Sequence, residues 1–211
     1  MTRQLLRPAA LGAAVHNGWA ILVTIDADGR RPAVVDRRRV ELIAAEVPSN
    51  PFHHEGLRLP LTEAAAVVER SRASSLAHAR DALAALVKAC PQSRIEAIAL
   101  PEPRKVPEQL ADVLASGNVV YVADRHMYEV ALTKAAASLR LPVVRHPRDQ
   151  EFASAAASLG VRELTVRKYL EGLRVSLGPP WQKDHRAAAA GAIGALGRKV
   201  RIDLRAAQPA R

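Results

Sequence analysis

Three acidic residues stand out in the sequence, because each lies beside the end of a predicted strand or helix. Glu102 lies between two prolines directly after an apolar segment, Asp184 falls in the first turn of a predicted helix, and Asp124 directly precedes another. Each also has a structural explanation. Glu102 can be a solvated loop acid, Asp124 can cap its helix, and Asp184 can be favoured by the positive end of its helix. The sequence leaves these alternatives open.

The other groupings of reactive side chains point away from several classes of enzyme. The chain has no Gly-rich phosphate loop, no Ser/His/Asp order and no cysteine cluster, which disfavours nucleotide hydrolases and zinc enzymes. His53, His54 and Glu55 are consecutive, but adjacent side chains in an extended loop diverge and no partner follows at ligand spacing. We therefore interpret this segment as a polar loop.

The net charge of +10 favours a polyanionic partner such as DNA or RNA. A bias toward arginine spread along the chain would give the same total. Arg37 and Arg39 in one predicted strand, and Lys183 and Arg186 in the last predicted helix, are the candidate nucleic-acid contacts. A solvated strand face explains the two arginines equally well.

The sequence also predicts a compartment. Cys90 is the single cysteine, which excludes an internal disulfide and suits a reducing cytosol. Arg3 and Arg7 precede an apolar run, as in a secretory signal, but His16 and Asn17 interrupt that run early. No window reaches the roughly 18 uninterrupted apolar residues that a membrane helix needs. We expect a soluble, cytoplasmic protein without membrane contact.

The elements that would position these residues begin with three strands. Residues 10–16, 19–25 and 32–43 are separated by Asn17-Gly18 and Asp28-Gly29, dipeptides that suit tight hairpin turns. The remaining predictions, in chain order, are a loop over 44–59, a helix over 61–89 with Thr62 as N-cap, a strand over 94–100 parallel to the first, a helix over 107–115, a strand or loop over 119–122, a helix over 125–139 with Asp124 as N-cap, a strand over 141–145, and helices over 149–159, 165–177 and 182–196.

Composition and spacing together predict one domain. Aromatic residues make up only 3% of the chain, so Ala, Leu and Val must build the core, which favours helices that approach a sheet closely. No internal repeat or flexible linker divides the chain. We expect a single domain over residues 1–197 and a flexible basic tail over 198–211.

This order of elements resembles the ribonuclease H-like superfamily, and the analogy is closest to resolvases of the RuvC and YqgF type. The resemblance rests on residues 11–14 with 18–20 (LGAA, GWA), on 98–102 (IALPE) and on 181–188 (WQKDHRAA). It implies an α/β fold with a mixed five-stranded sheet, in which three antiparallel strands precede parallel strands and helices flank the sheet.

The resemblance also implies metal-dependent phosphodiester hydrolysis. That chemistry uses two Mg²⁺ or Mn²⁺ ions about 4 Å apart, held by carboxylates from the ends of the first and fourth strands and from the last helix. Glu102 and Asp184 would be the metal ligands, with Asp124 or the imidazole of His16 as irregular additions. At the end of the first strand, where the resemblance implies a metal-binding acid, this sequence has Ala14. Because alanine cannot ligate a metal, we expect a degenerate site.

Two functions follow from these observations. One is a domain that binds or processes structured nucleic acid, with a divalent ion if it is catalytic. The other is a non-catalytic scaffold or protein-interaction module of the same fold, which would act as a homodimer or with a protein partner. The missing first-strand acid favours the second function, and the positive charge favours the first.

Overall fold

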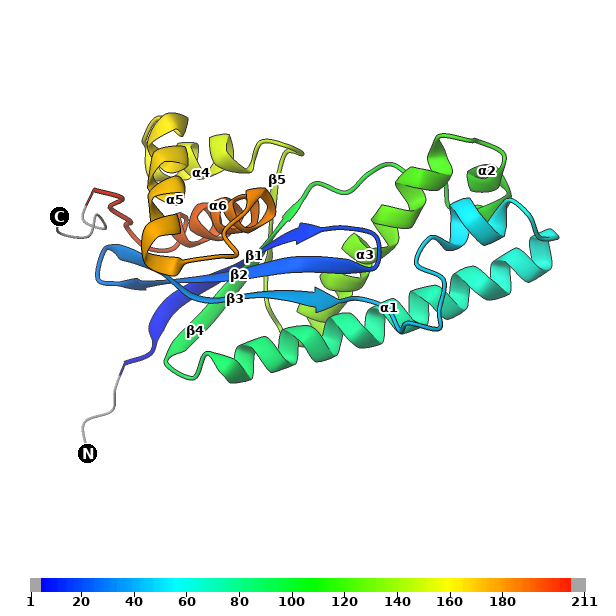
Figure 1. The fold of residues 1–211 in the computed structure, drawn as a ribbon, viewed down its shortest axis with the longest axis horizontal. Coiled ribbons are helices and arrows are strands. Elements are labelled where there is room, and N and C mark those ends of the chain that lie inside the picture. Colours follow the sequence, from blue (N-terminus) through cyan, green and yellow to red (C-terminus); the bar gives the residue numbers. More distant parts are fainter. Residues whose placement is uncertain (1–4, 206–211) are drawn as a thin grey trace.

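The computed structural model, which describes residues 5–205, is built around a five-stranded sheet in the order β3-β2-β1-β4-β5 (Figure 1). β1 (Arg7–Val15), β2 (Trp19–Asp28) and β3 (Arg31–Glu41) form an antiparallel meander. β4 (Ser93–Pro101) pairs parallel to β1, and β5 (Val143–His146) pairs parallel to β4. The predicted mixed sheet is therefore confirmed.

Both hairpins turn at the predicted dipeptides. Gly18 and Gly29 have φ angles of 86° and 62°, a left-handed conformation that glycine adopts without strain. The first turn is closed by a backbone hydrogen bond of 2.8 Å from the His16 N–H to the Trp19 carbonyl. The turn thus places His16 and Trp19 side by side at one end of the sheet.

Six α-helices and one π-helical turn complete the described part of the chain. Most of them begin and end close to the residues expected from the sequence. In chain order they are η1 (Pro51–Gly56), α1 (Leu61–Ala89), α2 (Leu110–Leu114), α3 (Val119–Ser138), α4 (Glu151–Leu159), α5 (Glu163–Leu177) and α6 (Lys183–Gly197). None of the helices within residues 5–205 is long and apolar enough to cross a membrane.

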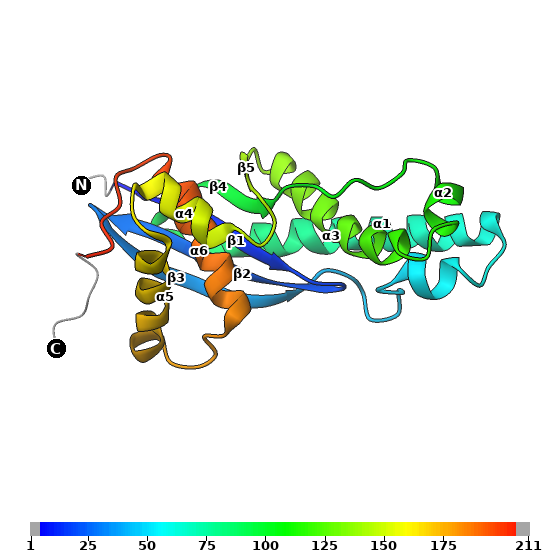
Figure 2. The same cartoon turned by 90° about the horizontal axis from the view of Figure 1, so that it is seen from above.

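The helices form two layers, one on each face of the sheet. Figures 1 and 2 show α4, α5 and α6 together on one face and α1 and α3 on the other. Side chains alternate between the faces: Leu11 and Leu22 pack in the α1–α3 core, whereas Ala10 and Ile21 pack in the α6 core. The first half of α1 continues past the sheet and forms a lobe with η1, α2 and the start of α3.

Two predictions near α3 were wrong. Residues 119–122 form the first turn of α3 instead of a strand or loop, so Asp124 lies inside the helix and Asn118 is its N-cap. The run of β-branched and aromatic side chains has strand propensity. Val120, Ala123 and Met127 nevertheless recur at helical spacing and are buried, so tertiary packing decides the conformation.

Two further predictions near α1 need correction. The N-cap of α1 is Pro60, and no side chain caps the start of this helix with a hydrogen bond. Thr62 lies within the helix. The segment over 44–59, predicted as a loop, contains η1, which begins at Pro51. A proline is well placed there because the first turn of a helix needs no N–H from it.

The segment after α6 packs against the sheet as far as the structure describes it. Ile202 and Leu204 are buried in the α6 core, and the Asp203 N–H donates a hydrogen bond of 2.8 Å to the Arg30 carbonyl. Residues 206–211 of the predicted tail lie outside the described residues. The division into one domain and a tail stays a prediction.

α6 lies unusually close to the centre of the sheet because both surfaces carry small side chains. A Cβ atom added to Gly12 on β1 would lie 1.8 Å from the Ala188 carbonyl oxygen and 2.8 Å from the Ala192 nitrogen. Gly191 faces Ala99 of β4 in the same way, with 3.2 Å between the added Cβ and the alanine methyl group. Backbone contact at Gly12 thereby fixes where the first turn of α6 meets the end of β1.

We predict that Gly12→Ala lowers the free energy of unfolding by about 3 kcal/mol or more, because α6 must move away from β1 to admit the methyl group. Gly172→Ala is the matched control. Gly172 is exposed in α5 with open space around its Cβ position, so this change should raise stability by up to about 1 kcal/mol. Urea denaturation of both variants measures the difference, and equal stability of Gly12→Ala and wild type would contradict the close contact.

Candidate functional site

The loop before α6 is held against the sheet by one arginine and one tryptophan. Arg37 of β3 donates hydrogen bonds to the carbonyls of Leu177, Gly178 and Pro180, at 2.6, 2.9 and 2.8 Å. The indole N–H of Trp181 donates to the Leu170 carbonyl at 2.6 Å. These contacts satisfy the carbonyls at the end of α5 and fix the point at which α6 begins.

The first turn of α6 carries two side chains with different environments. The Gln182 N–H donates a hydrogen bond of 3.4 Å to Nδ1 of His185, which stabilises the start of the helix. His185 is buried. Burial is the main cause that lowers its pKa, and the positive charge of the nearby Arg37 lowers the pKa further. Asp184 instead points outward and is about one-third exposed.

Asp184 meets the end of the first strand through His16. Nε2 of His16 lies 3.0 Å from Oδ2 of Asp184, and a carboxylate only accepts, so this nitrogen carries the donated hydrogen. The His16 ring is stacked on Trp19, with 3.9 Å between centroids and 6° between the planes. The Arg39 guanidinium also lies over Trp19, 4.2 Å from the ring centroid, and its Nε donates to Glu41 at 2.9 Å.

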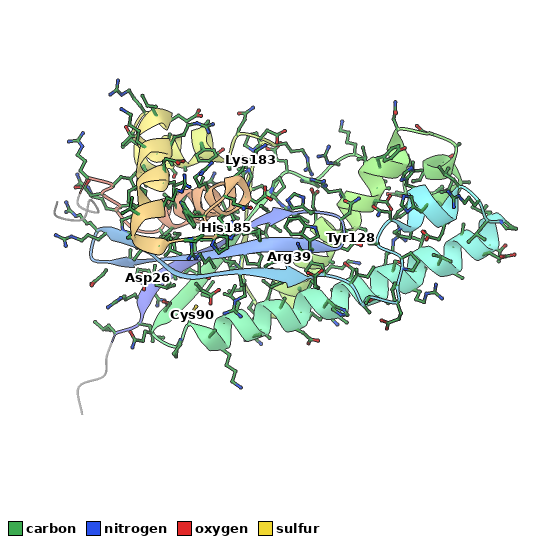
Figure 3. All side chains as sticks on the ribbon, in the orientation of Figure 1. Asp26, Arg39, Cys90, Tyr128, Lys183 and His185 are labelled. Atoms are coloured by element: carbon green, nitrogen blue, oxygen red, sulfur yellow. The ribbon has the colours of Figure 1, made fainter. Side chains whose placement is uncertain are left out.

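Trp19, Arg39 and Asp184 border an open hollow of about 280 Å³ between β3 and the start of α6. Figure 3 labels Arg39 on β3, with Lys183 and His185 on α6. Arginine guanidinium groups bind phosphate with directed N–H donors, and this wall of the hollow carries several. The residues that line it include Trp19, Ile21, Arg37, Arg39, Asp184 and His185. The hollow can therefore hold an anionic group beside a carboxylate that is already hydrogen-bonded.

The three predicted acids occupy separate environments. Glu102 follows β4 as predicted, its side chain is exposed, and its N–H donates to the His146 carbonyl at 2.8 Å. Asp184 contacts His16, as above, and Asp124 lies in α3. Within residues 5–205, these three acidic side chains share no hydrogen-bond or ion-pair partner. Their roles as catalytic or metal-binding residues stay predictions.

Asp124 caps a helix, although not the one expected. Its two carboxylate oxygens accept hydrogen bonds from the backbone N–H groups of Phe52 and His53, at 3.0 and 3.3 Å. Those groups belong to the first turn of η1, so Asp124 satisfies them from a different helix. Its side chain is buried, and burial raises its pKa to about 6. This position explains the residue structurally.

The four basic residues predicted to contact nucleic acid differ in how many hydrogen bonds and ion pairs they already form within the protein. All three hydrogen bonds of Arg37 go to the loop before α6, and Arg186 forms an ion pair of 3.1 Å with Glu171. Lys183 and Arg39 are exposed. Of the four, these last two are the best placed to meet a large anionic partner.

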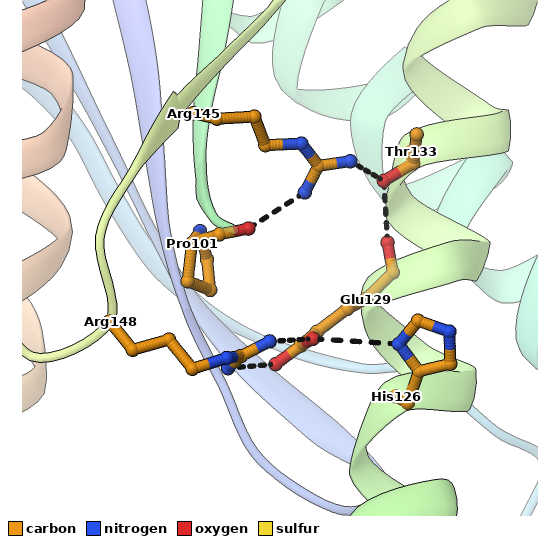
Figure 4. Close-up of polar contacts among 6 residues, drawn as sticks. All are labelled: Pro101, His126, Glu129, Thr133, Arg145 and Arg148. Carbon is orange, nitrogen blue, oxygen red and sulfur yellow. Dashed lines mark hydrogen bonds and ion pairs between the residues drawn. The ribbon is translucent and has the colours of Figure 1, made fainter. Parts of the chain in front are cut away.

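A second polar cluster, at the ends of β4 and β5, was not predicted from the sequence (Figure 4). Glu129 of α3 is only 2% exposed and accepts two hydrogen bonds from Arg148, at 2.8 and 2.5 Å. Arg145 bridges the Pro101 carbonyl and the Thr133 hydroxyl, each at 2.8 Å. The cluster ties α3 to the sheet.

Glu129 is the central charge of this second cluster. Burial alone would raise its pKa, but the His126 imidazole 3.9 Å away and the hydrogen-bonded positive charge of Arg148 more than offset burial and lower the pKa. Arg104 is a partly buried cation near this carboxylate. Burial and the neighbouring Arg148 lower its pKa, and its buried Nε–H has no hydrogen-bond partner among the described residues. The buried Glu129 carboxylate is therefore the negative charge that offsets the positive charges of Arg148 and Arg104.

The side chains around Asp184 do not fit a pair of divalent ions. Such a centre needs three or four converging carboxylates, but β1 carries no acid and the neighbour of Asp184 is an imidazole that donates to it. Among the described residues, no group of three or more His, Cys, Asp or Glu side chains is arranged to hold a metal ion.

The fold resembles that of RuvC from Thermus thermophilus. That solved structure matches with a TM-score of 0.52 and 13% sequence identity, covering 89% of this chain and 93% of that chain. T. thermophilus RuvC in complex with a Holliday junction substrate matches with a TM-score of 0.49 and 16% identity, covering 89% and 92%. The chain thus has the predicted ribonuclease H-like fold. The sequence matches no protein-family model and none of the curated proteins.

We predict that Asp124→Asn changes the pH dependence of stability. Because burial raises the pKa of folded Asp124 from 3.8 to about 6, the folded state keeps a proton that the unfolded chain loses between these values. Its contribution is therefore fully present below pH 4 and is lost as pH rises through 6. Relative to the variant, wild type should lose of the order of 2 kcal/mol between pH 4 and 7. Urea denaturation at several pH values tests this, and a constant difference would contradict it.

We also predict that Glu129→Gln lowers the free energy of unfolding by about 3 kcal/mol, because it leaves Arg148 and Arg104 without their buried counter-charge. Glu163→Gln is the control. Glu163 pairs with Arg167 at an exposed position on α5, so its loss should cost less than about 1 kcal/mol. Thermal denaturation compares the two variants, and equal effects would show that the buried cluster contributes no more than a surface ion pair.

Proposed function

We propose that this chain binds structured nucleic acid, DNA or RNA, through the end of the sheet where β2, β3 and the start of α6 border the hollow, next to the end of β1. The contact between His16 and Asp184 is the observation that carries the proposal. It joins the end of the first strand to the start of the last helix beside an arginine-lined hollow. In the resembled RuvC-type proteins, these are the elements from which nucleic-acid-processing residues come.

Charge supports a polyanionic partner for this surface. The chain carries a net charge of +10, and the hollow is bordered by Arg37 and Arg39, with exposed Lys183 on the adjoining turn of α6. Phosphate contacts of this kind bind without reading sequence, so they suit recognition of a nucleic-acid shape. We therefore expect binding that depends strongly on salt.

Binding, as opposed to hydrolysis, is the activity that the side chains support. Glu102 and Asp184 are the residues that would hold Mg²⁺ or Mn²⁺ if the chain were a nuclease. Asp184 is engaged with His16, and Glu102 lies in an exposed loop and belongs to no group of three or more potential metal ligands among residues 5–205. A site with so few acids is expected to lack most of the two-metal activity.

A second candidate function is a protein-interaction module, and a groove of about 490 Å³ between α1 and α3 favours it. Its apolar lining includes Phe52, Leu76 and Met127, and charged side chains such as Arg72 and Lys134 border it. Apolar grooves with a polar rim are typical of protein-binding surfaces. Either a second copy of this chain or a different protein would suit it.

We predict that the wild-type protein shifts branched DNA or an RNA–DNA hybrid in a gel and cleaves neither substrate in Mg²⁺ or Mn²⁺. Its affinity should fall steeply as salt rises, because phosphate contacts release counterions. The gel resolves binding and cleavage together, and Asp184→Asn runs beside the wild type.

Three results of this assay have different meanings. Metal-dependent cleavage that is lost in Asp184→Asn would establish a nuclease and overturn the binding-only proposal. Binding without cleavage supports the proposal. Absence of both would reject nucleic acid as the partner and leave the protein-interaction module, which analytical ultracentrifugation tests directly through self-association.

A further inference from the structure

We infer that the His16–Asp184 contact takes the place of a bound divalent ion, so that a backbone phosphate of nucleic acid enters the hollow directly onto Arg39 without a bridging cation. This inference rests on the proposed function, because it concerns how the same surface receives its ligand. It goes further by stating that binding is independent of metal and by naming the arginine that meets the phosphate.

The first step of the argument is the charge of Asp184. A carboxylate beside a phosphate repels it unless a cation or a hydrogen-bond donor offsets the negative charge. In a metal-dependent site the ion does this. Here the imidazole of His16 donates to Oδ2 of Asp184 at 3.0 Å, so this oxygen already has a hydrogen-bond donor. The carboxylate therefore has its partner before any ligand arrives.

The second step is that His16 is fixed in place. Its ring lies flat on Trp19, with 3.9 Å between centroids and a 6° angle between planes. The tight turn at Gly18 joins the two residues. An ion that displaced the imidazole from Asp184 would also have to break this stacking, which adds to its cost. The turn thus holds the imidazole in position to donate to Asp184 before a ligand binds.

The third step concerns Arg39. Its guanidinium lies 4.2 Å from the centroid of the Trp19 ring, so the same tryptophan that holds His16 also holds the arginine. Only its Nε is used, in an exposed pair with Glu41. Its two terminal nitrogens have no hydrogen-bond partner among residues 5–205 and can meet phosphate oxygens in a paired geometry. Exposed ion pairs are weak, so the pair with Glu41 does not prevent this.

The decisive experiment measures binding of fluorescently labelled branched DNA and RNA–DNA hybrid to the full chain by anisotropy, in EDTA and in Mg²⁺ at matched ionic strength. Wild-type affinities should agree within about twofold. Arg39→Gln should weaken binding several-fold and reduce the slope of log affinity against log salt by about one. Arg94→Gln is the matched control, because the exposed Arg94 side chain also pairs with the acid two residues along its strand, Glu96, but lies at the start of β4 beside the start of β1, away from the hollow.

A second measurement tests the replacement of the ion without using nucleic acid. His16→Asp places a second carboxylate beside Asp184, and the two repel each other until a cation binds between them. Millimolar Mn²⁺ should raise the melting temperature of this variant and leave that of the wild type unchanged. A Mn²⁺ shift in the wild type, or none in the variant, would overturn the inference.

The outcomes separate this inference from the function on which it rests. Absence of wild-type binding in both buffers would reject the proposed function itself. Binding that requires Mg²⁺, or that Arg39→Gln and Arg94→Gln weaken equally, would overturn only the inference. Inorganic phosphate at matched ionic strength should change binding by less than about twofold, and efficient displacement by it would assign the hollow to a small phosphate ligand instead.

Discussion

The close backbone contact between Gly12 and Ala188 is the constraint on which the rest of the structure depends. With no side chain at Gly12, α6 lies almost directly on β1, and the first turn of the helix reaches the end of the strand. Only then can Asp184 meet His16. A larger residue at this one position would raise the helix and separate the two groups, however well each was formed. The site is therefore a consequence of how closely a helix approaches the sheet.

Much of the fold could be predicted because its signals are local. Asn17-Gly18 and Asp28-Gly29 fix two turns, and the apolar runs between them fix three strands. Residues 119–122 are different, because their β-branched side chains favour a strand, whereas burial of Val120 in the core makes them the first turn of α3. Propensity is a property of the segment itself, whereas burial is a property of the whole fold.

The candidate site was only partly predictable, for the same reason. Asp184 could be placed in the first turn of a helix from its neighbours in sequence. Its pairing with His16 spans 168 positions, and no local pattern indicates it. Glu129 and Arg148 present the same difficulty, because neither belongs to a recognisable motif and only the packing of α3 against the end of β5 brings them together. Asp124 shows the converse, a capping residue correctly suspected but assigned to the wrong helix.

The separation of the two cores by the sheet has a consequence for communication within the molecule. The hollow at α6 draws on one core, and the groove between α1 and α3 draws on the other. Side chains of a strand alternate between faces, so a rearrangement on one side reaches the other only by moving a strand backbone. Ligands on the two surfaces should therefore bind with little mutual influence, and either surface can change in sequence while the other is kept.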